Sequence, residues 1–251
     1  MLSVVLVVRN EAENIAECLE SIKDLAEDIV VVDGYSTDDT VKIAKSYGSR
    51  VFQAEPKGYT EPFREFGITK AKGEWILNLD ADEVVTKELA AEIISIIQKS
   101  TYNSYWIPRK NMLQKKHWVR FTYPDYQLRL YKKDGVKFTS EVHNGVHAVG
   151  QSGRLKEPMI HYSFRSWKQL EEKRDRVTTI EAENLLKNTK MTPFNTVKYM
   201  FIRPLVVFIY YLIARGAWKN GRGDLLIAYD SLLYNMQIAQ KAIMMENARS
   251  S

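Results

Sequence analysis

The first hundred residues alternate between two hydrophobic periods, and this alternation constrains the fold more than any other feature. Residues 3–8, SVVLVV, form a nearly continuous β-branched run, which is typical of a strand buried on both faces of a parallel sheet. Asn10 and Glu13 then form a capping-box-like start, and apolar residues recur behind it at helical spacing. Because this strand-then-helix rhythm repeats, we predict an α/β fold with a mostly parallel sheet.

The rest of the chain divides into two further stretches. The repeated rhythm predicts strands at 29–32, 51–53 and 75–79, and helices at 37–47, 61–72 and around Leu89, Ile93 and Ile97. Strand-like pieces at 104–108, 127–131, 136–139, 142–149 and 159–164 predict a mixed or antiparallel extension of the sheet. A charged helix should follow from residue 166 to about 187. We therefore expect one α/β domain at 1–165, with halves 1–100 and 101–165, and a helical extension at 166–251.

Composition excludes several classes of protein. Cys18 is the one cysteine of the 251 residues, which excludes a disulfide framework and CxxC metal or redox sites and fits a reducing compartment. The N-terminal residues carry no basic stretch ahead of their apolar run, unlike a secretory signal peptide, so we expect them to belong to the fold. The formal charge of +5 is small and unevenly spread.

A basic segment and an apolar segment stand out. Residues 109–120 contain five Lys and Arg, no acidic residue and Trp118; they can form a solvated face or meet anionic lipid, a phosphorylated small molecule or nucleic acid. Pro204–Ala214 is an uncharged run of eleven residues, too short to cross a bilayer alone, since about 20 are needed. Its aromatic and cationic flanks are typical of a helix lying in a membrane interface; the alternative is a buried or dimer-interface helix.

Acidic residues follow the predicted parallel strands. Glu11 comes after the first strand, Asp33 ends the second, and Asp80 and Asp82 follow the strand WILNL. Ligands gather beyond the carboxyl ends of such strands, and carboxylates crowded there are unfavourable unless something cationic or a hydroxyl donor binds. This pattern indicates a ligand site.

Asp80 and Asp82 are separated by one residue, so in an extended segment both carboxylates face the same side and suit Mg²⁺ or Mn²⁺. The alternative is a turn that caps the following helix. Asp33 can accept hydrogen bonds from a ribose or a base, whereas Ser36 is interpreted as a helix cap. No GxGxxG or GxxxxGK[ST] loop follows the first strand, which argues against a dinucleotide oxidoreductase and a P-loop NTPase.

Four motifs in order, VVLVVRNEAENI, VVVDGYSTDDT, FREFGITKAKGEW and ILNLDADE, resemble the nucleotide-sugar half of family 2 inverting glycosyltransferases of the GT-A fold. The resemblance covers roughly residues 1–100 and weakens toward 165. With YPDYQLRLYKK, EVHNGVH and MIHYSF, the pattern is similar to bacterial lipopolysaccharide-core and related envelope-glycan glucosyltransferases. It implies a UDP-linked or similar nucleotide-sugar donor, a divalent metal and a glycan or lipid-linked acceptor.

The resemblance also implies roles for individual residues. Arg9, Glu11, Asp33, Arg64 and Asp80 match nucleotide-sugar-binding positions, and Asp80 and Asp82 match the metal and diphosphate motif. His161 matches a histidine that reaches the metal or diphosphate, although a strand histidine is as often a core residue.

An inverting transfer needs a general base, and the expected position of this base is occupied differently here. Relatives tend to read Val-His-Glu where this chain reads Val142-His143-Asn144. We therefore expect Asp125 to be the base, with Glu141 second; His143, or loss of activity, is the alternative. Asp125 can equally be a turn former.

Two other functions compete with this one. A sugar nucleotidyltransferase should carry a Gly-rich basic loop after the first strand, and a non-catalytic membrane scaffold would explain Asn144. We expect no nucleic-acid partner, because the acidic crevice repels a phosphate backbone. The prediction is thus an enzyme in the cytoplasm, peripheral to the cytoplasmic membrane, with homo-oligomerisation left open.

Overall fold

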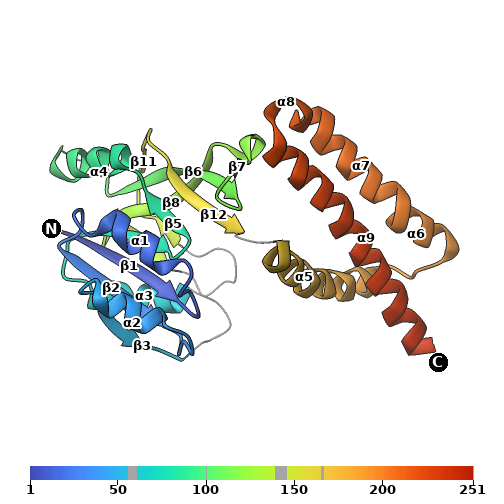
Figure 1. The fold of residues 1–251 in the computed structure, drawn as a ribbon, viewed down its shortest axis with the longest axis horizontal. Helices are drawn as coiled ribbons and strands as arrows, with labels where there is room; N and C mark the ends of the chain where they lie inside the picture. The colour runs from blue at the N-terminus through green and yellow to red at the C-terminus, as the bar shows by residue number, and fades with distance from the viewer. Residues whose placement is uncertain (56–60, 100, 139–145, 165–166, 251) are drawn as a thin grey trace. The chain divides into compact units, whose positions relative to one another are not determined.

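The computed structural model describes residues 1–55, 61–99, 101–138, 146–164 and 167–250 (Figure 1). Contacts divide the chain into two compact units. The α/β unit comprises Met1–Lys110 and Pro124–His161, and the helical unit comprises Asn111–Tyr123 and Tyr162–Ser251. The sequence predicted a boundary near residue 165; the contacts place it after His161 and add Asn111–Tyr123 to the helical unit.

The main sheet has the strand order β3-β2-β1-β4-β8-β6-β12-β5. Its strands are β1 (Leu2–Val8), β2 (Asp28–Asp33), β3 (Arg50–Gln53), β4 (Trp75–Asp80), β5 (Glu83–Val85), β6 (Ser104–Leu113), β8 (Asp125–Lys132) and β12 (Met159–Phe164). β7 (His117–Trp118) and β11 (Gly153–Arg154) pair with β6, and β9 (Val136–Phe138) pairs with β10 (Val146–Ala148). β1 to β4 pair in parallel, whereas β8 runs antiparallel to β4 and β6, and β12 runs antiparallel to β5. The predicted mixed, mostly parallel sheet is confirmed.

Two apolar layers cover the two faces of this sheet. Because side chains alternate along a strand, Val4 and Leu6 of β1 join the cluster containing α1 (Ile15–Ile22), α2 (Thr40–Ser46) and α4 (Lys87–Lys99). Val5 joins the opposite cluster, which contains α3 (Glu61–Lys70) and Val136 of β9. β1 is therefore buried on both faces, as its uninterrupted apolar sequence predicted.

Two of the predicted strands differ clearly in their bounds from those of the structure. The strand expected to end at Pro108 continues to Leu113, because β6 pairs first with β8 and then with β7. The strand expected at 142–149 is described only from Val146 to Ala148, and residues 139–145 lie outside the described part of the chain.

The helical unit is built around two long helices. It contains η1 (Arg120–Thr122), α5 (Trp167–Asn188), α6 (Pro193–Val197), η2 (Lys198–Ile202), α7 (Arg203–Ile209), η3 (Tyr210–Ala214), α8 (Ala217–Asn220) and α9 (Arg222–Ser250). α9 packs against α5 and against α7. Two ion pairs join α9 to α5: Asp230 lies 2.5 Å from Arg174, and Lys241 lies 2.6 Å from Asp175.

The segment Asn111–Tyr123 is held at the start of α9. The buried carboxylate of Asp224 accepts hydrogen bonds from the backbone N–H groups of Arg120 and Phe121, at 2.6 and 3.1 Å. Gly223 allows close approach, because a Cβ there would lie 2.3 Å from the carbonyl oxygen of Trp118. Hydrogen bonds to the Asp224 side chain thus tie the segment Asn111–Tyr123 to α9.

The apolar segment forms a longer helix than the sequence predicted. α6, η2, α7 and η3 run on as one helix, Pro193–Ala214, of 22 residues. The uncharged run Pro204–Ala214 forms only the second half of this helix. In the first half, the four residues between Lys198 and Arg203 are apolar. By length and composition alone, this is the one helix in the described ranges that could cross a membrane, and 6% of its most apolar window is buried.

Candidate active site

The parallel strands bring three of the predicted acidic residues to one edge of the sheet. Val8 at the end of β1 is in register with Asp33, and Val7 is in register with Asp80. Glu11 follows β1 directly. The carboxyl ends of β1, β2 and β4 therefore converge as predicted for an open α/β sheet.

Two loops at this edge are bonded to each other. Asn10 adopts a left-handed conformation with φ 56°, and its N–H donates to Ser36 Oγ at 2.9 Å. The N–H of Thr37 donates to Asn10 Oδ1 at 2.8 Å. Ser36 thus has a structural role, though by bridging two loops and not by capping α2.

Asp33 is fully buried beneath these loops. Its two carboxylate oxygens accept from the N–H of Ser36 at 3.2 and 3.1 Å. Gln53 Nε2 lies 3.5 Å from Oδ2. The carboxylate is held in one orientation before any ligand arrives.

Glu11 lies in the field of the other acids. Burial raises the pKa of its carboxyl, and the negative charges of Asp82, Asp80 and Asp38 raise it further, against a hydrogen bond from Asn14 that lowers it. That hydrogen bond, from Asn14 Nδ2 to Glu11 Oε2, is 2.5 Å long. The neighbouring carboxylates therefore repel the charged form of Glu11, and a cation or a hydroxyl donor would relieve this repulsion.

Asp80 is shared between two arginines from different elements. Its Oδ1 lies 2.5 Å from Arg64 Nη2 on α3, and its Oδ2 pairs with Arg129 Nη2 on β8. Both arginines are buried. Burial raises the pKa of Asp80, but the adjacent charges of Arg129 and Arg64 outweigh it and hold the pKa well below its ordinary value.

The pairing continues from Arg129 across the sheet. Arg129 Nη2 lies 2.7 Å from Oε1 of the fully buried Glu83, and this oxygen lies 3.4 Å from Arg109 Nη1. Arg109 binds Asp125 through Nη2 at 2.7 Å and Nε at 2.9 Å. We call this row, Arg64–Asp80–Arg129–Glu83–Arg109–Asp125, the charge ladder.

Sequence reasoning missed three members of the charge ladder. Arg109 was assigned only to the basic segment, and Glu83 and Arg129 to no role. The available signal was an arginine inside the strand sequence LRL, where a charge is unfavourable without a partner, and a glutamate directly after the Asp-Ala-Asp motif.

Asp82 and His161 form a separate pair. Pairing of β12 with β5 sets His161 opposite Glu83, and His161 Nε2 lies 3.3 Å from Asp82 Oδ2. The other oxygen, Asp82 Oδ1, is buried and has no hydrogen-bond partner in the described part of the chain. An unpartnered carboxylate oxygen beside an imidazole suits a divalent cation.

The three predicted metal ligands are not equivalent. Among the described residues, no three His, Cys, Asp or Glu side chains are arranged to hold a metal ion. Asp82 and His161 are adjacent, whereas both oxygens of Asp80 are engaged by arginines. Mg²⁺ is commonly bound by one or two carboxylates together with substrate phosphates, so two protein ligands fit a site completed by a diphosphate.

The two candidate bases differ in what the structure describes. Asp125 is partly exposed on β8, and besides Arg109 it accepts a hydrogen bond from Gln127 Nε2 at 2.8 Å. Glu141, together with His143 and Asn144, lies outside the described residues. Arg9, predicted to contact the nucleotide, is exposed at the end of β1.

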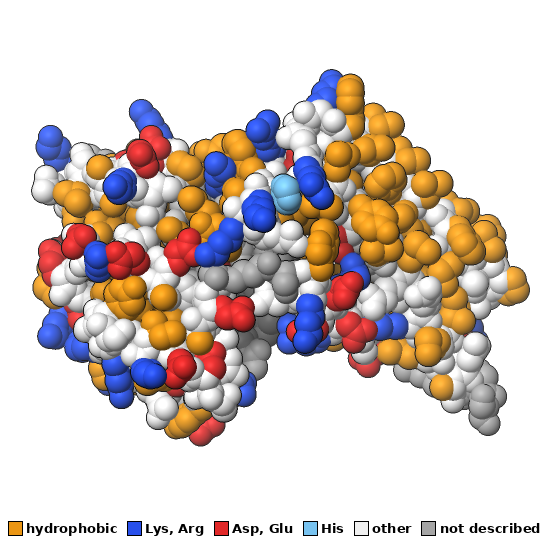
Figure 2. All heavy atoms as spheres, in the orientation of Figure 1, with side chains coloured by type: hydrophobic (Ala, Val, Ile, Leu, Met, Phe, Trp, Pro, Cys, Tyr) orange, Lys and Arg blue, Asp and Glu red, His pale blue; other side chains and the backbone are white. Residues whose placement is uncertain are grey.

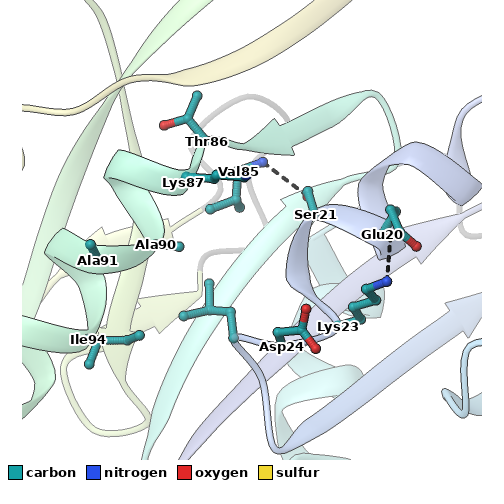
Figure 3. A pocket seen from close by; sticks show the side chains of 11 residues that line it. Glu20, Ser21, Lys23, Asp24, Val85, Thr86, Lys87, Ala90, Ala91 and Ile94 are labelled. Atoms are coloured by element: carbon teal, nitrogen blue, oxygen red, sulfur yellow. Dashed lines mark hydrogen bonds and ion pairs between the residues drawn. The ribbon is translucent and has the colours of Figure 1, made fainter.

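A cleft of about 640 Å³ lies elsewhere on the α/β unit, between α1 and α4 (Figure 3). Some of its polar groups are paired within the protein: the N–H of Val85 donates to Ser21 Oγ at 3.1 Å, and Lys23 lies 2.5 Å from Glu20. None of the predicted site residues lines it. The cleft therefore does not compete with the edge of the sheet as the site.

Comparisons with known proteins indicate the family of the chain. Residues 3–154 match the model of glycosyl transferase family 2. A Rickettsia felis protein described as an uncharacterized glycosyltransferase is 32% identical over 203 residues, covering 75% of this chain and 71% of the relative. The lipopolysaccharide core biosynthesis glycosyltransferase LpsC of Rhizobium meliloti is 24% identical over 254 residues, covering 96% of this chain and 91% of LpsC.

A solved structure agrees in fold. The crystal structure of S. aureus TarS superposes with a TM-score of 0.50 at 17% identity, over 95% of this chain and 55% of TarS. The predicted GT-A architecture, a mostly parallel sheet flanked by helices with C-terminal helices, is confirmed. With a family match that covers more than half of its residues, the chain belongs to glycosyl transferase family 2.

Proposed function

We propose that this glycosyltransferase moves a hexose from a UDP-linked sugar, with inversion, to a glycan or lipid-linked acceptor in cell-envelope polysaccharide or lipopolysaccharide synthesis. The observation that carries the proposal is the convergence of Glu11, Asp33, Asp80 and Asp82 at the carboxyl ends of three parallel strands. Similarity to LpsC, which is named for lipopolysaccharide core biosynthesis, supports the acceptor class.

Each donor-binding residue has a role that its surroundings support. The buried carboxylate of Asp33, fixed by Ser36, can accept from the base or ribose of the nucleotide. Arg64 and Arg129 bring positive charge to Asp80, which would otherwise repel a diphosphate. Arg9 is free to move toward a nucleotide because it is exposed at the rim.

A divalent cation, Mg²⁺ or Mn²⁺, when bound by Asp82 and His161, supplies positive charge for the leaving diphosphate. The unpartnered Asp82 Oδ1 supports this ligand set. Asp80 stays a predicted third ligand, and it would have to give up Arg64 or Arg129 to bind the ion.

In the proposed transfer, the acceptor hydroxyl attacks the anomeric carbon opposite the leaving UDP. The new carbon–oxygen bond forms as the bond to the diphosphate breaks, and the hydroxyl proton passes to a carboxylate. Asp125 is the first candidate, held by Arg109, and Glu141 is the second. Asp125→Asn should therefore lower kcat with little change in donor binding.

The same proposal places the enzyme in the cytoplasm, peripheral to the cytoplasmic membrane. The helix Pro193–Ala214 supports this location, since its apolar side chains are largely uncovered by protein. A peripheral enzyme would meet a lipid-linked acceptor at the membrane surface.

The test is calorimetric titration with a panel of nucleotide sugars, with and without Mn²⁺, on the intact protein and on Asp82→Ala. We expect Mn²⁺-dependent binding of a UDP-sugar that Asp82→Ala abolishes, while Asp24→Ala, at an exposed carboxylate of the first helix–strand connection, leaves it unchanged. Absence of nucleotide-sugar binding under every metal condition would contradict the catalytic proposal and favour the membrane scaffold.

A further inference from the structure

The helix Pro193–Ala214 exposes a continuous apolar ridge. Five side chains at four-residue spacing are 43–65% exposed: Val197, Phe201, Leu205, Ile209 and Ile213. Four-residue spacing keeps side chains on one face of a helix. Ile202, Val206 and Tyr210, at 51–58% exposure, form a second row beside them. We call these eight residues the apolar ridge; Figure 2 shows hydrophobic side chains covering this helix.

The ridge is too extensive for a face in contact with water. A helix that is apolar on all sides is normally buried in protein or in a membrane. Here the inner side packs on α9, and the outer side is covered by none of the described residues. Large exposed apolar patches on soluble proteins mark interaction surfaces.

The charges around the ridge select the partner. Residues 184–223 contain seven Lys and Arg and no acidic residue. Arg203 is exposed within the helix, and Arg215 and Lys219 are exposed just beyond its end. Lys219 and Trp218 lie together, with the ammonium 4.8 Å from the ring centre. Cations and aromatic rings beside an apolar face are the composition of a helix that binds anionic lipid.

The basic segment adds to the same end of the helix. The ring centre of Phe121 lies 5.2 Å from that of Tyr211, and Arg215 Nη2 donates to the carbonyl oxygen of Phe121 at 2.6 Å. These contacts bring the exposed Lys115, Lys116 and Arg120 into the unit that carries the ridge. A second copy of this chain would bring a second set of these cations, which would repel the first.

The ridge geometry also decides between spanning and lying flat. In a spanning orientation Arg203, midway between Pro193 and Ala214, would lie near the centre of the bilayer, where a charge is most unfavourable. The neighbouring helix α9 would enter the bilayer as well, with Asp230 and its ion pair to Arg174 on α5. A helix lying in the plane of the membrane avoids both.

We propose that the helical unit docks on an anionic lipid bilayer, with the apolar ridge inserted at the interface and the helix Pro193–Ala214 parallel to the membrane plane. This deepens the peripheral location proposed above by naming the surface, its partner and its orientation. Lipid binding is measured without donor or metal, so its failure and failure of the transferase proposal are distinguishable.

Co-sedimentation of the full chain with vesicles tests the proposal. We expect binding to phosphatidylcholine vesicles that contain phosphatidylglycerol, and about tenfold weaker binding to phosphatidylcholine alone. Leu205→Asp and Ile213→Asp should weaken binding about tenfold or more. Ile180→Asp is the matched control, since Ile180 on α5 is 54% exposed, as Leu205 is 52%. A second pair of variants tests the contribution of the cations. Lys219→Glu should weaken binding to the phosphatidylglycerol vesicles, whereas Lys168→Glu on α5 should leave it unchanged.

Depth measurements test the orientation. Cysteines introduced at Phe201, Leu205 and Ile213 can be spin-labelled selectively, because the native Cys18 is buried in the core. The three labels should report one shallow depth along the apolar ridge. Depths that change steadily from Phe201 to Ile213 would overturn the in-plane orientation. Failure to bind either vesicle, or a lipid-free dimer that Leu205→Asp converts to monomer, would overturn the lipid partner.

Discussion

At the scale of single residues, the site depends on charges that neutralise one another away from water. Glu83 has no exposed surface, and Arg129 is 7% exposed, so each is tolerated because the other is present. Arg129 also binds Asp80, which makes it the residue that connects the Asp-Ala-Asp motif to β8.

The charge ladder predicts a stability effect. Replacing Arg129 with Met leaves Arg109, at 3.4 Å, as the one basic side chain paired with the buried Glu83 among the described residues. We expect the free energy of unfolding in urea to fall by about 3 kcal/mol. Adding Glu83→Gln should recover part of this loss, because no lone charge then remains. If Arg129→Met alone were as stable as the parent protein, the charge ladder would not contribute to stability as proposed. Lys42→Met, at an exposed lysine, is the control.

Glu11 predicts a dependence of stability on pH. The pKa of Glu11 in the folded chain is raised above its ordinary value of 4.5, so the folded chain binds this proton more tightly than the unfolded chain does. The contribution of Glu11 to stability is present below about pH 4.5 and is lost as the pH rises through the folded value. Glu11→Gln should therefore gain stability relative to the parent above that window. Urea unfolding at several pH values measures the difference in stability between Glu11→Gln and the parent protein. A difference that stays constant across the pH range, or an equal gain from Glu88→Gln on α4, would refute the prediction.

At the scale of elements, α3 approaches the sheet closely at a glycine. A Cβ on Gly67 would lie 2.5 Å from Cγ1 of Val5 and 3.0 Å from Cγ2 of Val32. The same helix carries Arg64, one of the two partners of Asp80. Packing of the helix and placement of a site residue are therefore linked.

Gly67→Ala should push α3 away from β1 and β2. We expect a loss of about 2 kcal/mol in the free energy of unfolding and weaker nucleotide-sugar binding, because Arg64 moves with the helix. Adding Val5→Ala to Gly67→Ala should restore much of the lost stability and much of the lost nucleotide-sugar binding. Thr69→Ala, at an exposed position of α3, serves as the control. Normal donor binding by a destabilised Gly67→Ala would show that Arg64 is positioned independently of this contact.

At the scale of the whole molecule, the chain separates two kinds of surface. The acids of the candidate site all belong to the α/β unit, whereas the apolar ridge and most of the basic segment belong to the helical unit. Donor binding and membrane binding should therefore respond to different substitutions.

We expect a double dissociation between two variants. Asp82→Ala should lose Mn²⁺-dependent donor binding and sediment normally with phosphatidylglycerol vesicles. Leu205→Asp should lose vesicle binding and keep its donor affinity. Calorimetry and co-sedimentation on the same preparations measure both. A variant that loses both functions while its unfolding curve is unchanged would mean that the two surfaces act as one.

The sequence by itself determined the α/β class, the mostly parallel order of the first strands and the convergence of Glu11, Asp33 and Asp80. It did so because strand and helix periods are local, and the carboxyl ends of parallel strands meet at one edge of a sheet. Only the tertiary structure decided which charges pair. Arg129, Glu83 and Arg109 lie on β8, β5 and β6, far apart in the chain, and pairing of strands brings them together. It also decided that Pro193–Ala214 is one helix with an uncovered face, because exposure depends on what packs against a segment and not on its composition.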